Sequence, residues 1–245
     1  MKTLRKNNAP CHKNAARVAA LAAALALAGV AAAAPGRAGV PSPAARKSQN
    51  HVPASLADVR PFYAVAAKHP HIALVNVAGA IPEDAWRLAA TYAASRLQIN
   101  IWTNTIPASV TARLVDDPAY TAKAVGNPNA KIGVFFERRG GKGCKSLSAP
   151  GAWAVLDVSA VEAGAPDAQT LRDRYAKLVL KGLAEAVGGG ATLEPFCAMF
   201  YGSQSVEGMD KTNITLAPMC YFPMLEILRQ IGGMDMTRAA QSEEE

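Results

Sequence analysis

Apolar residues alternate between two spacings along the chain, and this alternation predicts strands interleaved with helices. Four runs have the length and composition of buried strands: residues 71–79, 99–107, 130–139 and 151–161. Two segments between them have helical spacing: residues 82–98, which open with Pro82 and two acids, and the shorter 118–125. Strands that alternate with helices favour an α/β (α+β) fold over a helix bundle or a β-sandwich.

The longest predicted helix covers residues 167–187. Apolar residues recur there at every fourth position and give the helix one continuous apolar side: Leu171, Tyr175, Val179, Leu183 and Val187. Asp167 or Thr170 is the predicted N-cap, and Gly188 is the predicted end.

A glycine-rich basic segment, "GGKGCKSLSAP" at 140–150, connects the third and fourth predicted strands. A phosphate-binding loop needs Gly-Lys-Ser/Thr leading into a helix, and here Gly-Lys-Gly lies between two strands. The segment is therefore predicted to be an exposed connection that carries solvated basic side chains.

Residues 1–33 are predicted to be a signal peptide. A basic start precedes an apolar run from Val18, which ends in small residues that allow cleavage after Ala33. The run is short and rich in alanine for a membrane span, and the alternative to cleavage is an uncleaved anchor. This leader predicts a secreted or periplasmic protein with no stable membrane span after cleavage.

Removal of the leader also changes the charge. The whole chain carries a net charge of +7, and subtracting the five basic residues of the leader leaves +2, which argues against nucleic acid as a partner. The remaining chain is predicted to comprise three parts: a flexible linker at 34–54, rich in Pro, Ala, Arg and Ser, one domain at 55–235, and a disordered tail at 236–245.

Three cysteines follow the leader: Cys144, Cys197 and Cys220. An exported protein can form disulfides, so one bridge and one free thiol are expected. The sequence alone leaves all three pairings open.

The segment "KGLAEAVGGGATLEPFCAM", residues 181–199, has a distinctive spacing of Gly188, Cys197 and Met199. In this spacing the chain resembles the archaemetzincins, a branch of the metzincin zinc peptidases. Their signature is His-Glu-x-x-His-x-x-Gly-x-x-His-Cys-x4-Cys-x-Met, followed later by Cys-x-x-Cys. The resemblance covers roughly residues 70–233 and implies a metzincin-like mixed twisted sheet with packed helices, an active-site-type helix, and a Met-turn at Met199.

The same register shows that the catalytic positions are replaced. Lys181, Glu185 and Ala191 stand where the three zinc-binding histidines belong, and Gly182 stands where the general-base glutamate belongs. A catalytic zinc needs about three protein ligands and an open water position. The resemblance therefore implies a degenerate member in which zinc is lost, with no other cofactor.

The family's second, structural zinc site is reduced as well. Thr192 stands for its first cysteine, and the later Cys-x-x-Cys has become Cys220-Tyr221-Phe222-Pro223. Because Cys197 and Cys220 belong to one site in the family, the resemblance implies that they are neighbours. We predict that they form a disulfide in an oxidising compartment and that Cys144 is unpaired.

Lys181 and Glu185 lie one helical turn apart and have opposite charges. One hypothesis places the Lys181 ammonium near the former metal site, paired with Glu185, and the other makes them a solvated surface pair. The histidines after the leader offer no clear metal site. His51 lies in the linker, and His69 and His71 are interpreted as ordinary residues before the first strand.

Three functions are compatible with these residues. The preferred one is an exported, catalytically inactive pseudopeptidase that binds extended peptides or an envelope partner. The second is a hydrolase that uses other residues, for which the candidates are Ser148, Ser203, Ser205 and Cys144. The third is a structural protein of the envelope, for which Asn213 of "NIT" would be a glycosylation acceptor in a eukaryotic host.

Overall fold

The protein is represented by a computed structural model that describes residues 51–59, 71–109 and 127–233. The predicted signal peptide, the tail, His69 and the predicted helix at 118–125 lie outside these residues. No helix in the described ranges is long and apolar enough to cross a membrane.

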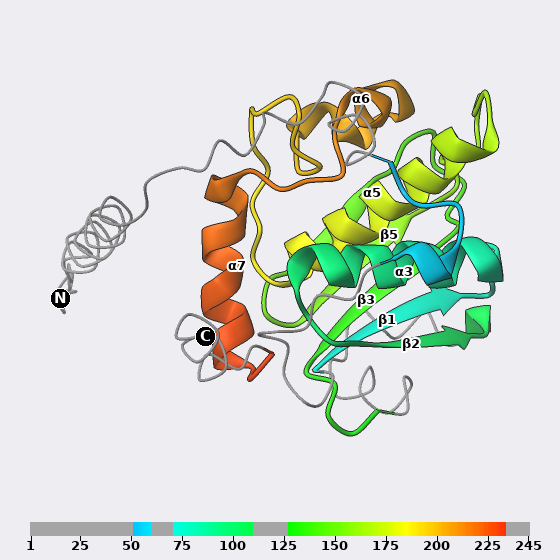
Figure 1. Cartoon of the computed structure of the whole chain (residues 1–245). Coiled ribbons are helices and arrows are strands. Elements are labelled where there is room, and N and C mark those ends of the chain that lie inside the picture. The colour runs from blue at the N-terminus through cyan, green and yellow to red at the C-terminus, as the bar shows by residue number, and fades with distance from the viewer. Residues whose placement is uncertain (1–50, 60–70, 110–126, 234–245) are drawn as a thin grey trace, which may run out of the picture. The chain divides into compact units, whose positions relative to one another are not determined.

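A five-stranded mixed sheet forms the centre of the molecule (Figure 1). Its strands, in chain order, are β1 (Ile72–Val77), β2 (Ile101–Ile106), β3 (Ile132–Glu137), β4 (Ser146–Ala149) and β5 (Trp153–Asp157). Their order across the sheet is β2-β1-β3-β5-β4. The first four strands in this order run parallel, and β4 pairs antiparallel with β5 at one edge. The predicted α/β class with a mixed sheet is confirmed.

The central strands are buried throughout and mostly apolar, with Asn76 and Glu137 as the polar residues of β1 and β3. Every residue of β1 and of β3 is buried. Leu74, Val134 and Leu156 point into the larger core beneath the helices, and Val75 and Val155 point into a smaller cluster on the opposite face. Continuous apolar runs are typical of such doubly covered parallel strands.

Helices α3 (Glu83–Leu97) and α5 (Ala168–Ala186) pack against one another and cover one face of the sheet (Figure 1). The carboxylate of Asp167 accepts a hydrogen bond from the backbone N–H of Thr170 at 2.7 Å and caps α5. The helix ends before Gly188, whose φ of +88° suits glycine. The predicted bounds of the long helix are confirmed at both ends.

The C-terminal third is built from short elements that lead into a final helix. These are the 3-10 helix η3 (Tyr201–Gln204), α6 (Val206–Lys211) and α7 (Pro218–Gln230). Met199 lies in the turn before η3, is almost fully buried, and accepts a hydrogen bond at its carbonyl from the N–H of Thr192 at 3.0 Å. A buried methionine turn is therefore present where the sequence predicts one.

Two segments differ from the sequence-based expectation. The segment 140–150 is not only a connection, because it contains β4, which is short and polar and lacks the apolar run of the other strands. The last four residues of the predicted linker are described, and among them Val52 is buried in the core. Its N–H donates to Asp173 on α5 at 2.8 Å.

Candidate functional site

Lys181 lies on α5 with its side chain buried; only 5% of the residue is exposed. Its Nζ donates to Ser203 Oγ at 3.4 Å, and Ser203 Oγ in turn donates to the carbonyl of Ala198 at 3.2 Å. The ammonium thus connects the middle of α5 to the turn that carries Met199. A solvated surface position for Lys181, one of the two sequence hypotheses, is wrong.

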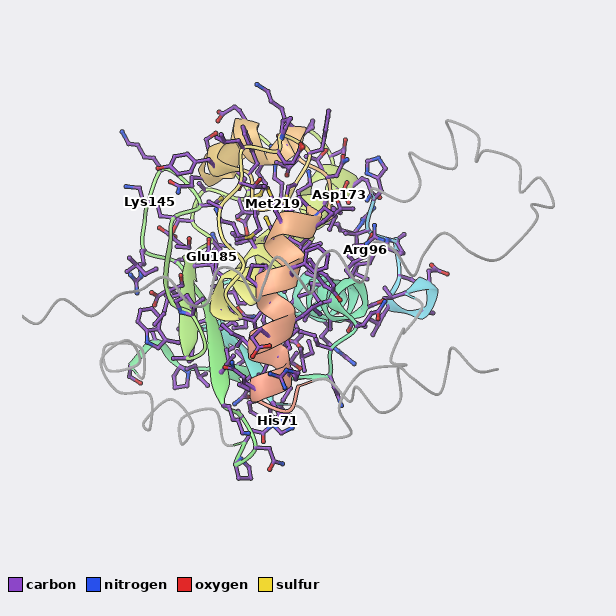
Figure 2. All side chains as sticks on the ribbon, turned by 90° about the vertical axis from the view of Figure 1, so that its left-hand side faces the viewer. His71, Arg96, Lys145, Asp173, Glu185 and Met219 are labelled. Atoms are coloured by element: carbon purple, nitrogen blue, oxygen red, sulfur yellow. The ribbon has the colours of Figure 1, made fainter. Side chains whose placement is uncertain are left out.

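Glu185 lies one turn further along α5, on the side of β4. Its Oε1 accepts a hydrogen bond from Ser146 Oγ of β4 at 2.9 Å, and its buried Oε2 has no hydrogen-bond partner. The carboxylate is therefore held by the edge strand, and only one of its two oxygens has a hydrogen-bond partner. Figure 2 shows Glu185 on α5 and, for orientation, Met219 at the amino end of α7.

Lys181 and Glu185 influence each other electrostatically without forming a salt bridge in the described structure. Burial lowers the pKa of Lys181, and the negative charge of Glu185 opposes this shift. Burial likewise raises the pKa of Glu185, against the Lys181 charge and the Ser146 hydrogen bond. Both shifts favour the neutral forms. The predicted direct pair is replaced by two separate contacts, to Ser203 and to Ser146.

Gly182, at the general-base position, is pressed against the sheet. A Cβ on Gly182 would lie 2.5 Å from Leu156 Cδ1, 2.9 Å from Val134 Cγ1 and 3.2 Å from Phe136 Cζ. These are side chains of the rigid core, so the helix approaches the sheet too closely for even a methyl group. A glutamate cannot occupy this position in the present packing.

The remaining motif positions have structural roles. At Gly188, the positive φ and a Cβ distance of 2.7 Å to Ile227 Cδ1 on α7 both require glycine. Ala191 is exposed, and Thr192 Oγ1 lies 2.9 Å from Met219 Sδ. None of these side chains brings a third nitrogen or oxygen ligand to Lys181 and Glu185.

Cys197 and Cys220 are buried neighbours whose sulfurs lie 3.8 Å apart. The predicted proximity is confirmed. The bond is not formed in this structure, because a disulfide needs about 2.05 Å and both residues are free thiols. Cys197 Sγ accepts N–H bonds from Ala217 at 3.1 Å and Met199 at 3.4 Å. Cys220 Sγ donates to the carbonyl of Gly190 at 3.3 Å, and burial raises its pKa to about 12.

Cys144 lies in the glycine-rich segment but is not exposed as that segment was predicted to be. It is fully buried, and its N–H donates to the carbonyl of Gln204 at 2.8 Å. Burial raises its pKa to about 11, so the thiol is protonated at neutral pH. Cys144 is a free thiol, like the other two cysteines, and its burial and protonation make it a poor nucleophile.

The serine candidates are not arranged as accessible nucleophiles: Ser203 has Lys181 beside it, but it is buried away from any substrate, and the other two have no adjacent base. Ser203 is 1% exposed, and its hydroxyl is engaged between Lys181 and Ala198. Ser205 caps α6 by accepting the N–H of Gly208 at 3.0 Å. Ser148 is exposed on β4 without a histidine contact. Activation of a serine needs an adjacent base, and His51 instead binds Asp173 at 2.5 Å.

The segment before β4 is held by a carboxylate that the sequence pattern did not single out. Asp157, at the end of β5, accepts N–H bonds from Arg139 at 3.1 Å and Gly141 at 3.0 Å and an O–H bond from Ser159 at 2.5 Å. Burial opposes ionisation, but these hydrogen bonds together hold the pKa of Asp157 below its usual value. The loop amides that a phosphate would need are thus already used by Asp157.

Within residues 51–59, 71–109 and 127–233, no group of three or more His, Cys, Asp or Glu side chains is arranged to hold a metal ion. The contacts that organise the site, through Ser146 and Ser203, were missed by the sequence analysis. The only available signal was that both serines lie near basic or acidic residues in the chain, and this does not specify a contact.

No protein-family model and no curated protein matches this chain. Solved structures similar to it include an archaemetzincin and a zinc-dependent peptidase. Archaemetzincin from Methanopyrus kandleri shares 16% identity over 66% of this chain and 96% of its own, with a TM-score of 0.49. A zinc-dependent peptidase from Methanocorpusculum labreanum shares 12% identity over 62% of this chain and 99% of its own, with a TM-score of 0.47. At these identities the likeness concerns the fold and leaves the activity of this chain open.

Proposed function

We propose that this chain is an exported, catalytically inactive relative of the archaemetzincin peptidases that binds extended peptide segments along the edge strand β4. The main evidence for the loss of catalysis is the close packing around Gly182. The motif register assigns this position to the general base, and the contact with Leu156 leaves no space for a side chain.

The neighbouring position supports the same conclusion. A zinc site needs neutral imidazoles or carboxylates around an open coordination position, whereas Lys181 is buried here with its ammonium directed at Ser203. A cation at this point repels a divalent metal. Glu185 is one oxygen ligand on its own, and its bond to Ser146 directs it to the edge strand. We therefore infer that zinc is absent from the functional protein.

Peptide binding rests on the geometry of β4. The N–H of Asp157 donates to the carbonyl of Lys145 at 2.9 Å. Lys145 and Asp157, which lie opposite one another, are therefore a hydrogen-bonded pair of the antiparallel ladder. In an antiparallel ladder such pairs alternate, so Leu147, opposite Val155, also directs its backbone groups at β5. The N–H and C=O groups of Ser146 and Ser148 consequently face the open edge of the sheet.

An open edge with unsatisfied backbone groups accepts an additional strand. β4 is the last strand of the described sheet on that side, and Ser148 is exposed there. The leader supports a secreted or periplasmic location, in which unfolded segments of envelope proteins are the available ligands. A structural envelope protein without a peptide ligand is the second candidate, and the binding experiment below distinguishes the two.

Two variants of the mature protein test this binding mode: one lacks the backbone N–H of residue 148 and the other keeps it. Ser148→Pro removes the outward N–H without touching the ladder to β5, and Ser148→Ala keeps it. We expect peptides selected from a random library to bind wild type and Ser148→Ala equally and to bind Ser148→Pro at least ten-fold more weakly. Equal binding by both variants contradicts the edge mode, and stoichiometric zinc with zinc-dependent cleavage contradicts the loss of catalysis.

A further inference from the structure

A cavity of about 440 Å³ lies away from β4, between the segment around η1 (Leu56–Asp58) and the first turns of α3 and α5. Figure 1 shows η1 lying against α3. Four apolar residues and three charged residues line it: Ala54, Leu56, Ala85, Leu88, Asp84, Arg87 and Arg172. Its volume lies in the range of small-molecule sites.

Arg172 presents a positioned guanidinium to this cavity. Its Nη2 donates to Gln169 Oε1 at 2.8 Å, while its buried Nε has no hydrogen-bond partner. Gln169 is itself fixed, since its Nε2 donates to the carbonyl of Val52 and to Asp173, each at 2.9 Å. A buried donor without an acceptor is costly and uncommon. The guanidinium is therefore held in place. Its buried Nε has no surface that a ligand could reach, and Nη1, for which the described structure shows no hydrogen bond, is the group left for a ligand.

Arg87 supplies a second positive charge from α3, and the described structure gives it neither an ion pair nor a hydrogen bond. Both arginines lie in the second turns of their helices, which begin at Glu83 and Ala168. The amino ends of helices favour negative charge. The planar fork of a guanidinium matches a carboxylate bidentately, so the two arginines provide a site for a carboxylate.

Asp84 gives the cavity one negative charge beside these two positive ones. It has no ion pair with Arg87, although the two lie three residues apart on α3. Leu56 is 41% exposed at the cavity, a large fraction for a leucine, and Leu88 and Ala85 continue the apolar wall. The lining thus offers a place for a carboxylate, a place for an ammonium and an apolar surface.

We propose that this cavity binds the zwitterion of a free apolar α-amino acid. The carboxylate binds Arg87 and Arg172, the ammonium binds Asp84, and the side chain covers Leu56 and Leu88. The site is separate from β4 and does not depend on the proposed peptide binding. Acylated and amidated amino acids lack one of the two charges, and in a peptide the two charges are on different residues, so the lining predicts selection for the free amino acid.

Calorimetry on the mature chain with three related probes tests this assignment. We expect L-leucine to bind, and N-acetyl-L-leucine and L-leucinamide to bind at least ten-fold more weakly, because each lacks one charged end. No binding of leucine, or equal binding of N-acetyl-leucine, overturns the proposal.

Two variants test which residues bind the carboxylate and the ammonium of the ligand. Arg172→Gln is expected to weaken leucine binding at least ten-fold, and the matched control Arg229→Gln, at an exposed position on α7, is expected to leave it unchanged. Because Arg172→Gln also alters a buried contact, Asp84→Asn on the exposed first turn of α3 gives a second readout. It is expected to weaken leucine binding but not the residual binding of N-acetyl-leucine. If both leucine and N-acetyl-leucine bind Asp84→Asn as they bind wild type, Asp84 has no part in the site and the zwitterion assignment fails.

Discussion

The ammonium of Lys181 lies 3.4 Å from the hydroxyl of Ser203 and forms no salt bridge with Glu185, one turn along the same helix. Each of the two buried charges therefore depends on a serine from another element, Ser203 of η3 for the cation and Ser146 of β4 for the anion. Lys181 and Glu185, which the motif register assigns to metal ligands, thus connect α5 to η3 and to β4.

Lys181→Met is expected to destabilise the protein by about 2 kcal/mol, because it leaves the Glu185 carboxylate buried without a nearby cation. The double variant Lys181→Met/Glu185→Gln is expected to recover most of this loss, since glutamine keeps an acceptor for Ser146. Urea unfolding of the two singles and the double gives the coupling energy. A coupling energy near zero contradicts an electrostatic link between the two side chains.

Glu185 should make stability depend on pH in a defined direction. Its pKa is raised in the folded state above the usual 4.5, so its contribution is fully present below pH 4.5 and is lost as the pH rises through the folded-state pKa. We expect the free energy of unfolding of wild type to fall relative to Glu185→Gln over that window. Parallel curves for the two proteins contradict this pKa shift.

Gly182→Ala is expected to destabilise the protein by about 1–3 kcal/mol, although alanine favours a helix by about 1 kcal/mol. The added methyl would meet Leu156 and Val134 in the core. Gly190→Ala is the matched control, because a Cβ at Gly190 meets nothing within 4 Å, and its change should stay within about 0.5 kcal/mol. A stabilised Gly182→Ala variant contradicts the close approach of α5 to the sheet.

Cys197 and Cys220 are expected to form a disulfide when the protein folds in an oxidising compartment, with Cys144 left as a thiol. The two sulfurs lie 3.8 Å apart and must approach to about 2.05 Å. The two electrons and two protons pass to the disulfide of a thiol–disulfide oxidoreductase, which becomes a dithiol. Peptide mapping of the non-reduced protein identifies the pairing. Cys220→Ser should then cost about 3 kcal/mol under oxidising conditions and much less under reducing ones. Two alkylatable thiols at 197 and 220 in exported protein contradict the bond.

Apolar periodicity was sufficient to predict most of the fold. The apolar run at 71–79 predicted β1. The recurrence of apolar residues at every fourth position from Leu171 to Val187 predicted α5, and the flanking residues predicted its cap and its terminal glycine. These signals are local, because burial on one or both faces repeats at fixed intervals in the chain. β4 was missed for the same reason, since a four-residue edge strand of serines, leucine and alanine has no such repeat.

The site was predictable only in part. The spacing of Gly188, Cys197 and Met199 correctly indicated a helix end, a cysteine pair and a buried methionine turn. The partners of Lys181 and Glu185 could not be predicted, because they depend on how η3 and β4 are placed around α5. The burial of Cys144 had the same origin, in a contact with Gln204 that is distant in the chain.

Ser146 takes part in two features of the structure. Its hydroxyl donates a hydrogen bond to Glu185, and its backbone N–H and C=O face the open edge of the sheet. If a peptide binds at that edge as proposed and moves this serine, its hydrogen bond to the Glu185 carboxylate changes too. Peptide binding and proton uptake by Glu185 are then reciprocally linked, so the affinity for the peptide depends on pH.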